Sequence, residues 1–314
     1  MTQSKQINIA ICYYPNALKS AIFGLDELFA LANRVCIEQH INCKFSANII
    51  NIPSAIKQHE QSNFQIVLMP PSHVGNYYLY PDAKLIDWLN QQHKAGTVLA
   101  SACAGAFILA HTDALSQRSV TTHWGLAKEF QRYFPQQVLD SNRILIDHGD
   151  ILTAGGMMSW LDLGLDIVAK HASASVMRQL GKILVIDTAP REQRYYQQFV
   201  PSMTHGDHAV LDVQQQINLG YSQPLTVSQL AANVHLSERT LLRRFNQATD
   251  YSPNQYIQRL RIQKACDLLE TTQHSFDHIA HLVGYQDSTA CRKAFIKIIG
   301  LAPSAFRQRF THPN

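Results

Sequence analysis

Apolar residues recur with two different periods over the first half of the chain. Runs of strand length rich in apolar residues are Ile7–Tyr13, Cys43–Ile52, Phe64–Met69 and Thr97–Ala102. Longer stretches with apolar residues at helical spacing are Ser20–Gln39, Pro81–Ala95 and Ala104–Leu115. Apolar strands that alternate with helices predict a parallel sheet with helices packed on its faces.

Two short strands and two helices are predicted to complete this domain. The strands Arg143–Asp147 and Asp150–Ala154 are separated only by His148-Gly149, a pair that suits a hairpin turn. Helices are expected over Met158–His171 and over about Ser175–Val185. Residues 1–186 are therefore predicted to form one α/β domain, a parallel-sheet sandwich.

The composition changes after residue 186. Residues 187–204 contain Pro190 and Pro201 together with Arg191, Arg194 and several glutamines and tyrosines, and we interpret them as a linker. Every element predicted after the linker is a short helix. Residues 205–314 are therefore predicted to form a separate all-α domain.

The all-α domain contains an internal near-repeat. Its first copy is Leu225–Phe245 and its second is Ser275–Phe295. Within them, Leu230-Ala231 corresponds to Ile279-Ala280, and His235-Leu236 corresponds to Gly284-Tyr285. A small residue that lets two helices cross, then a turn and a second helix, is the pattern of a helix-turn-helix unit. The sequence thus predicts two such units, joined by a long helix over Asn254–Glu270.

The second helix of each unit is the expected DNA-reading helix. In the first unit, Ser237 is a suitable N-cap, and Leu241 and Phe245 are expected to face the core. The outer face is then predicted to meet the major groove or the phosphates. The candidate DNA-binding residues are Glu238, Arg239, Arg243, Arg244 and Asn246 in the first unit, and Ser288, Thr289, Arg292 and Lys293 in the second. Among these, Arg244 and Lys293 are candidates for phosphate contacts, as are Lys297 and Arg307 outside the set.

Residues 225–310 resemble the AraC-type DNA-binding domain along their full length. The matching positions are Leu230-Ala231, Ser237, Arg239, Leu241, Arg243, Phe245, Pro253, Tyr256, Arg261, Ala265, Leu268-Leu269, Ile279-Ala280, Gly284-Tyr285, Asp287-Ser288, Phe295, Gly300, Pro303, Arg307 and Phe310. Cys291 departs from the pattern, which prefers Phe. This loss of an aromatic side chain leads us to expect looser packing in the second unit and a larger share of specific readout in the first.

Charge and composition agree with this interpretation. The chain has a net charge of +4, and residues 205–314 carry 11 basic against 8 acidic side chains, whereas residues 1–204 carry 16 against 15. An excess of basic residues in the helical part suits a phosphate-binding surface. The six cysteines form no CxxC pair and the histidines form no ligand-spaced cluster, so we expect no disulfide framework, metal or cofactor. No signal peptide or membrane segment is recognised, and we expect a cytoplasmic, nucleoid-associated protein.

The α/β domain contains one candidate for chemistry. In the run Val98–Ala110 a strand passes into a helix at Cys103, and small residues surround the turn. Such a turn pushes its side chain outward, and a helix N-terminus lowers the pKa of a thiol beside it. His123 follows twenty residues later and could be a partner for the thiol.

Residues 5–186 resemble the ThiJ/PfpI group of the class I glutamine amidotransferase-like superfamily, in the GlxA-like form fused to AraC-type domains. The pieces that match are the elbow at Cys103, Gly105-Ala106, Thr121–Trp124, Ile151–Gly156 and Asp162–Gly164. The resemblance implies a flavodoxin-like fold. It also implies a homodimer formed by this domain, and activation of transcription more often than repression.

Three departures separate this domain from its catalytic relatives. Ala104 stands where many have a histidine directly after the cysteine. The stretch Lys19–Gly24 lacks the glutamate that would bind the thiol, and the first acids, Asp26 and Glu27, are expected on the following helix. Met69–Ser72 replaces a Gly-rich turn, and its two prolines lack the N–H of an oxyanion site.

Three functional hypotheses for Cys103 and His123 remain open at this point, beside a purely structural role. They are vestigial catalytic candidates that now line an effector pocket, a working cysteine hydrolase or amidase pair, or a redox or electrophile sensor. We favour the first. The expected function is a sequence-specific transcription regulator, not an enzyme, that responds to a small metabolite bound by Cys103, Ala104, His123 and Trp124. Its expected partners are double-stranded DNA, a small-molecule effector, a second copy of the chain and, for an activator, RNA polymerase.

Overall fold

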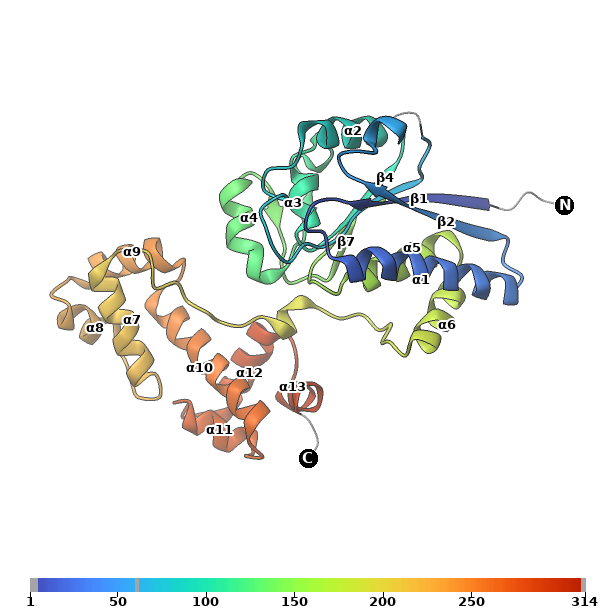
Figure 1. Cartoon of the computed structure of the whole chain (residues 1–314). Coiled ribbons are helices and arrows are strands. Elements are labelled where there is room, and N and C mark those ends of the chain that lie inside the picture. Colours follow the sequence, from blue (N-terminus) through green and yellow to red (C-terminus); the bar gives the residue numbers. More distant parts are fainter. Residues whose placement is uncertain (1–4, 60–61, 312–314) are drawn as a thin grey trace. The chain divides into compact units, whose positions relative to one another are not determined.

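The computed structural model describes residues 5–59 and 62–311. The chain divides into two compact units, Met1–Gln193 and Arg194–Asn314 (Figure 1). Among the described residues, no helix combines the length and apolar character that crossing a membrane requires.

A six-stranded sheet forms the centre of the first unit, in the order β2-β1-β3-β4-β8-β7. Its strands are β1 (Lys5–Tyr13), β2 (Cys43–Asn51), β3 (Ile66–Met69), β4 (Val98–Ala102), β7 (Leu145–Asp147) and β8 (Ile151–Ala154). All neighbours are parallel except β7 and β8, which form the predicted antiparallel hairpin. Because Met69, Ala102 and Ala154 end three adjacent parallel strands, the loops after them meet at one edge of the sheet.

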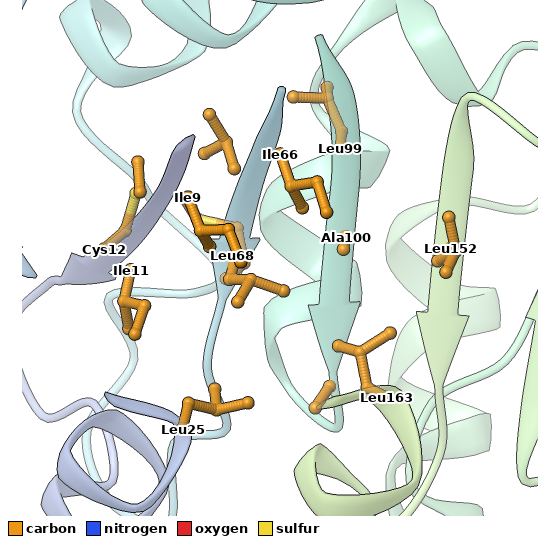
Figure 2. Packing of buried hydrophobic residues seen from close by; sticks show 14 of the residues in the cluster. Ile9, Ile11, Cys12, Leu25, Ile66, Leu68, Leu99, Ala100, Leu152 and Leu163 are labelled. Carbon is orange, nitrogen blue, oxygen red and sulfur yellow. The ribbon is translucent and has the colours of Figure 1, made fainter. Parts of the chain in front are cut away.

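Helices cover both faces of this sheet, as the pattern predicted. α1 (Lys19–Glu38), α5 (Trp160–His171) and α6 (Ala174–Leu184) lie along one side, and α2 (Ala83–Lys94) and α3 (Gly105–Ala110) along the other (Figure 1). Strand residues such as Ile9 and Leu68 pack with Leu25 from α1 and Leu163 from α5 (Figure 2). The α/β sandwich expected from the sequence is therefore confirmed.

Smaller elements differ from the prediction. The helix expected over Ala104–Leu115 ends at Ala110, where the Thr112 hydroxyl donates to the Leu109 carbonyl and a 3-10 turn, Asp113–Leu115, follows. The pattern also missed three short elements after that turn: β5 (Ser119–Val120), α4 (Ala127–Tyr133) and β6 (Val138–Leu139). The expected linker is not wholly irregular, because it includes the 3-10 turn η4 (Gln193–Tyr196).

The second unit consists of helices around two apolar clusters. α7 (His208–Gly220), α8 (Val227–Asn233) and α9 (Glu238–Thr249) contribute to the first cluster. α11 (Phe276–Leu282), α12 (Ser288–Ile299) and α13 (Pro303–Phe310) contribute to the second. α10 (Pro253–Thr271) provides residues to both, as the predicted joining helix should.

The turns of the two helix-turn-helix units share a left-handed residue, although the second turn is one residue longer. His235 and Gly284, which correspond in the repeat, both have a left-handed backbone, with φ of 56° and 90°. At Gly284 a Cβ would lie 2.5 Å from the Ser222 carbonyl oxygen, so glycine is required by packing as well as by φ. Ser237 and Asp287 cap the helices that follow, by accepting backbone N–H groups through their side chains.

Candidate effector site and DNA-binding surface

Cys103 occupies a sharp turn between β4 and α3. Its φ of 54° is left-handed, and its backbone N–H donates to the Ala154 carbonyl at 2.8 Å. A Cβ on Gly105 would lie 2.4 Å from the Met69 carbonyl oxygen, so α3 can start here only because that residue is glycine. The elbow predicted from the small residues is therefore present.

The Cys103 thiol is buried and largely protonated near neutral pH. The residue is 1% exposed. Burial raises the pKa of the thiol to about 11, although the backbone N–H groups of Ala104 and His123 face the sulfur and oppose the rise. The low-pKa thiol expected from the helix N-terminus is thus not found, because desolvation outweighs the amide contacts.

The His123 imidazole has other partners than the thiol. Its Nδ1 accepts the Gly125 N–H at 3.0 Å, and its ring stacks on Trp124 with centroids 5.3 Å apart. Burial lowers the pKa of His123, which favours the neutral ring that this acceptor role requires. Within the described residues no hydrogen bond joins the Cys103 and His123 side chains, so the pairing expected for catalysis is absent.

Two tyrosines lie near the thiol, and sequence reasoning did not single them out. Tyr14, which follows β1, is fully buried and donates to the Pro70 carbonyl at 2.5 Å. Burial and then the charge of the Cys103 thiolate raise the pKa of Tyr14. Tyr78 donates to Glu129 at 3.2 Å, and its pKa is raised to about 12, by burial first and then by that carboxylate. Asp26 and Glu27 lie on α1, as expected.

The four predicted effector-site residues are brought together at one edge of the sheet. Ala104 follows Cys103 directly, and the Thr122 hydroxyl donates to the Cys103 carbonyl at 2.7 Å. This hydrogen bond holds the segment that carries His123 and Trp124 against the elbow. Their roles as ligand contacts remain predictions.

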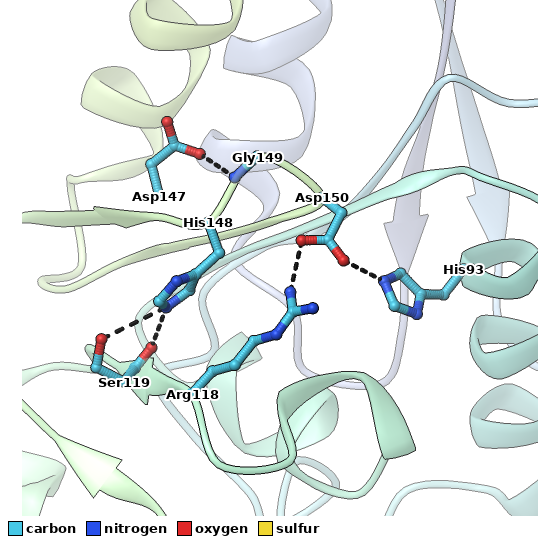
Figure 3. Close-up of polar contacts among 7 residues, drawn as sticks. All are labelled: His93, Arg118, Ser119, Asp147, His148, Gly149 and Asp150. Carbon is cyan, nitrogen blue, oxygen red and sulfur yellow. Dashed lines mark hydrogen bonds and ion pairs between the residues drawn. The ribbon is translucent and has the colours of Figure 1, made fainter.

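A polar cluster apart from the Cys103 elbow stabilises the β7–β8 hairpin. Asp150 forms an ion pair with Arg118 at 2.5 Å and a hydrogen bond with the His93 ring at 2.9 Å (Figure 3). The hydrogen bond from Arg118 is the main reason that the pKa of Asp150 falls to about 2. Nearby, His148 contacts Ser119, and Asp147 accepts the Gly149 N–H (Figure 3). The described residues include no group of three or more side chains arranged to bind a metal.

The outer face of α9 presents the expected residues. Leu241 and Phe245 are buried, while Glu238, Arg239, Arg243 and Asn246 are exposed. Leu242 was not predicted, but it lies between these side chains along the helix and is 40% exposed. Its chemistry suits contact with a thymine methyl group.

Arg244 has a different place from the one expected. Its guanidinium forms a two-pronged ion pair with Asp207, at 2.6 and 2.8 Å, and the side chain is 33% exposed. Asp207 is the N-cap of α7, so this arginine joins α7 to α9. The sequence could not indicate this role, because Arg244 lies next to α7 only once the domain has folded.

In the second unit the predicted residues lie along α12. Thr289, Arg292 and Lys293 are exposed, and Ser288 is half-buried beside the N-cap Asp287. The Arg292 guanidinium lies over the Phe276 ring at 4.8 Å and within 3.6 Å of Asp277. The residues Ser288, Thr289, Arg292 and Lys293 thus share one helix, and their contacts with DNA remain predictions.

Two further residues of this unit clarify the sequence analysis. Arg307 was expected to contact phosphates, but it donates to the carbonyls of Leu269 and His274 and thus ties α13 to the end of α10. Cys291 is fully buried in the second cluster. The looser packing expected there remains a prediction.

Comparisons with known proteins divide the chain in the same way. The DJ-1/PfpI family matches residues 32–170, and a helix-turn-helix domain matches residues 230–309. The HTH-type transcriptional regulator CdhR of Pseudomonas aeruginosa is 26% identical over 224 residues, which are 71% of this chain and 66% of CdhR. The aligned region is therefore slightly less than two thirds of that relative.

Two further proteins are similar to large parts of this chain. The HTH-type transcriptional regulator GlxA of Rhizobium meliloti is 24% identical over 70% of this chain and 68% of its own. A crystallised Vibrio parahaemolyticus protein shares the fold, with a TM-score of 0.50 and 18% identity over 57% of this chain and 100% of that one. The chain thus contains a DJ-1/PfpI domain followed by an AraC-type helix-turn-helix domain, as the resemblance predicted.

Proposed function

We propose that this protein is a sequence-specific DNA-binding transcription regulator whose DJ-1/PfpI domain responds to a small metabolite. The observation that carries the proposal is the pair of capped helix-turn-helix units, in which α9 and α12 present polar and basic side chains outward. An α-helix of this kind fits the major groove, where base edges can be read directly. The relatives that align over most of this chain are named transcriptional regulators.

The proposed effector site is the edge of the sheet at Cys103, Ala104, His123 and Trp124. Binding there changes how the first domain presents the second one to DNA, which requires the effector to prefer one of two arrangements. We further propose domains over residues 1–186 and 205–314, a homodimer through the first domain, and activation through RNA polymerase. Two copies would then read half-sites separated by helical turns of DNA.

Catalysis by Cys103 is the weaker hypothesis. A working cysteine nucleophile needs an accessible thiolate and a general base. Here the thiol is buried with a raised pKa, and the nearby imidazole accepts a backbone N–H. A ligand-binding role requires neither a thiolate nor a general base.

Genomic footprinting tests the proposal. The comparison is between wild type and the Arg239→Ala/Arg243→Ala double variant. A matched control is Arg34→Ala/Arg132→Ala, which removes the same charge from the first domain at side chains that are 59% and 71% exposed. We expect discrete peaks with a two-part motif in wild type and control, and their loss in the double variant. Peaks that persist unchanged in the double variant would refute a reading role for α9.

A further inference from the structure

Gln193 is buried where the first unit meets the linker sequence. It is 2% exposed. Its Nε2 lies within hydrogen-bond distance of three acceptors, the Thr121 hydroxyl at 3.1 Å and the carbonyls of Thr122 and Arg143 at 2.9 Å each. Its Oε1 accepts the Trp124 N–H at 3.2 Å, and its own backbone N–H donates to the Asn142 carbonyl at 2.7 Å. Both ends of the carboxamide are therefore satisfied, in a low-dielectric setting where such bonds are costly to lose.

The Gln193 side chain lies in a space, called the socket below, that is bounded by Gly155 and by its hydrogen-bond partners. Gly155, directly after β8, forms one wall. A Cβ at that position would lie 1.8 Å from the Gln193 Nε2 and 2.7 Å from the Thr122 carbonyl oxygen. Only glycine at 155 permits the glutamine to enter, so the socket and its occupant are matched.

The same socket adjoins the proposed effector site. Thr122 uses its hydroxyl to bind the Cys103 carbonyl and its own carbonyl to accept from Gln193. Trp124, a proposed effector contact, donates its backbone N–H to Gln193. A continuous set of hydrogen bonds thus connects the elbow to the end of the first unit.

The residues that follow Gln193 pack within the second unit. The Arg309 guanidinium lies 5.5 Å from the centre of the Tyr195 ring, and Tyr196 packs edge-on against Phe310 at 5.4 Å. The Arg194 side chain passes Gly300 so closely that a Cβ there would lie 2.2 Å from it. Within η4, Gln193 is therefore bound by residues of the first unit, and the next three residues contact the second unit.

We propose that Gln193 couples ligand binding at the proposed effector site to the mobility of the segment that leads into the DNA-binding domain. We call Gln193 in this role the latch. A molecule bound beside Cys103 and Trp124 displaces the Thr122–Trp124 segment and weakens the socket. Release of Gln193 frees the start of η4, and re-insertion restrains it. Gln193 acts as a positioning residue, and the inference rests on the proposed effector site.

Two measurements on the full chain test this latch. Trypsin cleavage after Arg191 and Arg194 reports the freedom of the segment that contains Gln193. The rate of Cys103 alkylation by iodoacetamide, resolved by peptide mass spectrometry, reports opening of the elbow. The variants are Gln193→Ala and Gln193→Glu, where the glutamate turns a carboxylate toward the three acceptors. Gln198→Ala, at an exposed glutamine of the same segment, is the matched control.

We expect both Gln193 variants to accelerate cleavage and Cys103 alkylation together, by about 5- to 150-fold, the range usual for coupled sites. Gln198→Ala should change neither rate. Wild type already alkylated at Cys103 should be cleaved faster than untreated protein, whereas alkylation should add nothing in Gln193→Ala. This wild-type comparison needs no variant to fold.

Two results would overturn the latch. One is faster cleavage in the Gln193 variants with an unchanged Cys103 rate, which would make Gln193 a local tether. The other is equal cleavage of alkylated and untreated wild type. Neither readout uses DNA, so failure of the latch is distinguishable from failure of the regulator proposal, which footprinting tests separately.

Discussion

At the scale of single residues, Cys103 lies at a turn that resembles a nucleophile elbow, yet burial raises the pKa of its thiol to about 11. Arg244 and Arg239 are close in sequence, yet only Arg239 is exposed, because Asp207 binds Arg244. The sequence indicated the elbow through its small residues, but it could not indicate Asp207, which is 37 positions from its partner.

The raised pKa of Cys103 predicts a steep pH dependence of its alkylation. Because the thiolate is the reactive form, the rate should rise about tenfold per pH unit between pH 7 and pH 10 in the folded protein. The measurement is the iodoacetamide rate at the Cys103 peptide in native buffer. The same peptide in denaturant is the control, and there the rate should level off above a pKa of about 8.5. A plateau near neutral pH in the native protein would contradict the buried, protonated thiol and revive the nucleophile hypothesis.

At the scale of elements, periodicity predicted the long segments and missed the tertiary ones. The strands of the sheet and the paired helices of the repeat were found because their apolar spacing is regular. β5, β6 and α4 were missed because they have two to seven residues each. The linker prediction did not reveal Gln193, whose side-chain partners are 50 to 72 positions away and therefore give no local pattern.

The Asp207–Arg244 ion pair predicts a specific effect on the helical domain. Asp207→Asn keeps a side chain that can cap α7 but removes the charge that binds Arg244, so thermal stability should fall. Asp212→Asn, at an exposed residue of α7, is the matched control and should have little effect.

The pH dependence of this stabilisation follows from the pKa of Asp207, which is lowered chiefly by its hydrogen bond from Arg244. A carboxyl whose pKa is depressed on folding contributes stability above its unfolded value of about 3.9, and that contribution is lost as the pH falls below it. The difference in melting temperature between wild type and Asp207→Asn should therefore be present at pH 7 and shrink below pH 4. A difference that is independent of pH would mean that packing, and not charge, links α7 to α9.

At the scale of the whole molecule, the boundary between the two compact units falls inside η4, after Gln193. The first unit contains the elbow and the Gln193 socket, and the second contains two helix-turn-helix units. The sequence predicted both domain types from their motifs. The latch at Gln193 emerged only from the structure, because it depends on the space left by Gly155 and on carbonyls from two separate loops.

The most direct test of the account is the affinity of the full-length protein for DNA, measured by fluorescence anisotropy. The two probes are a duplex recovered by in vitro selection and a scrambled duplex of the same composition, at one fixed salt concentration. The account predicts that wild type prefers the selected duplex by about 10³-fold or more. It also predicts that Arg239→Ala and Arg243→Ala each cost about 1–3 kcal/mol on that duplex. Equal affinity for both duplexes, unchanged in the variants, would contradict sequence-specific recognition by α9.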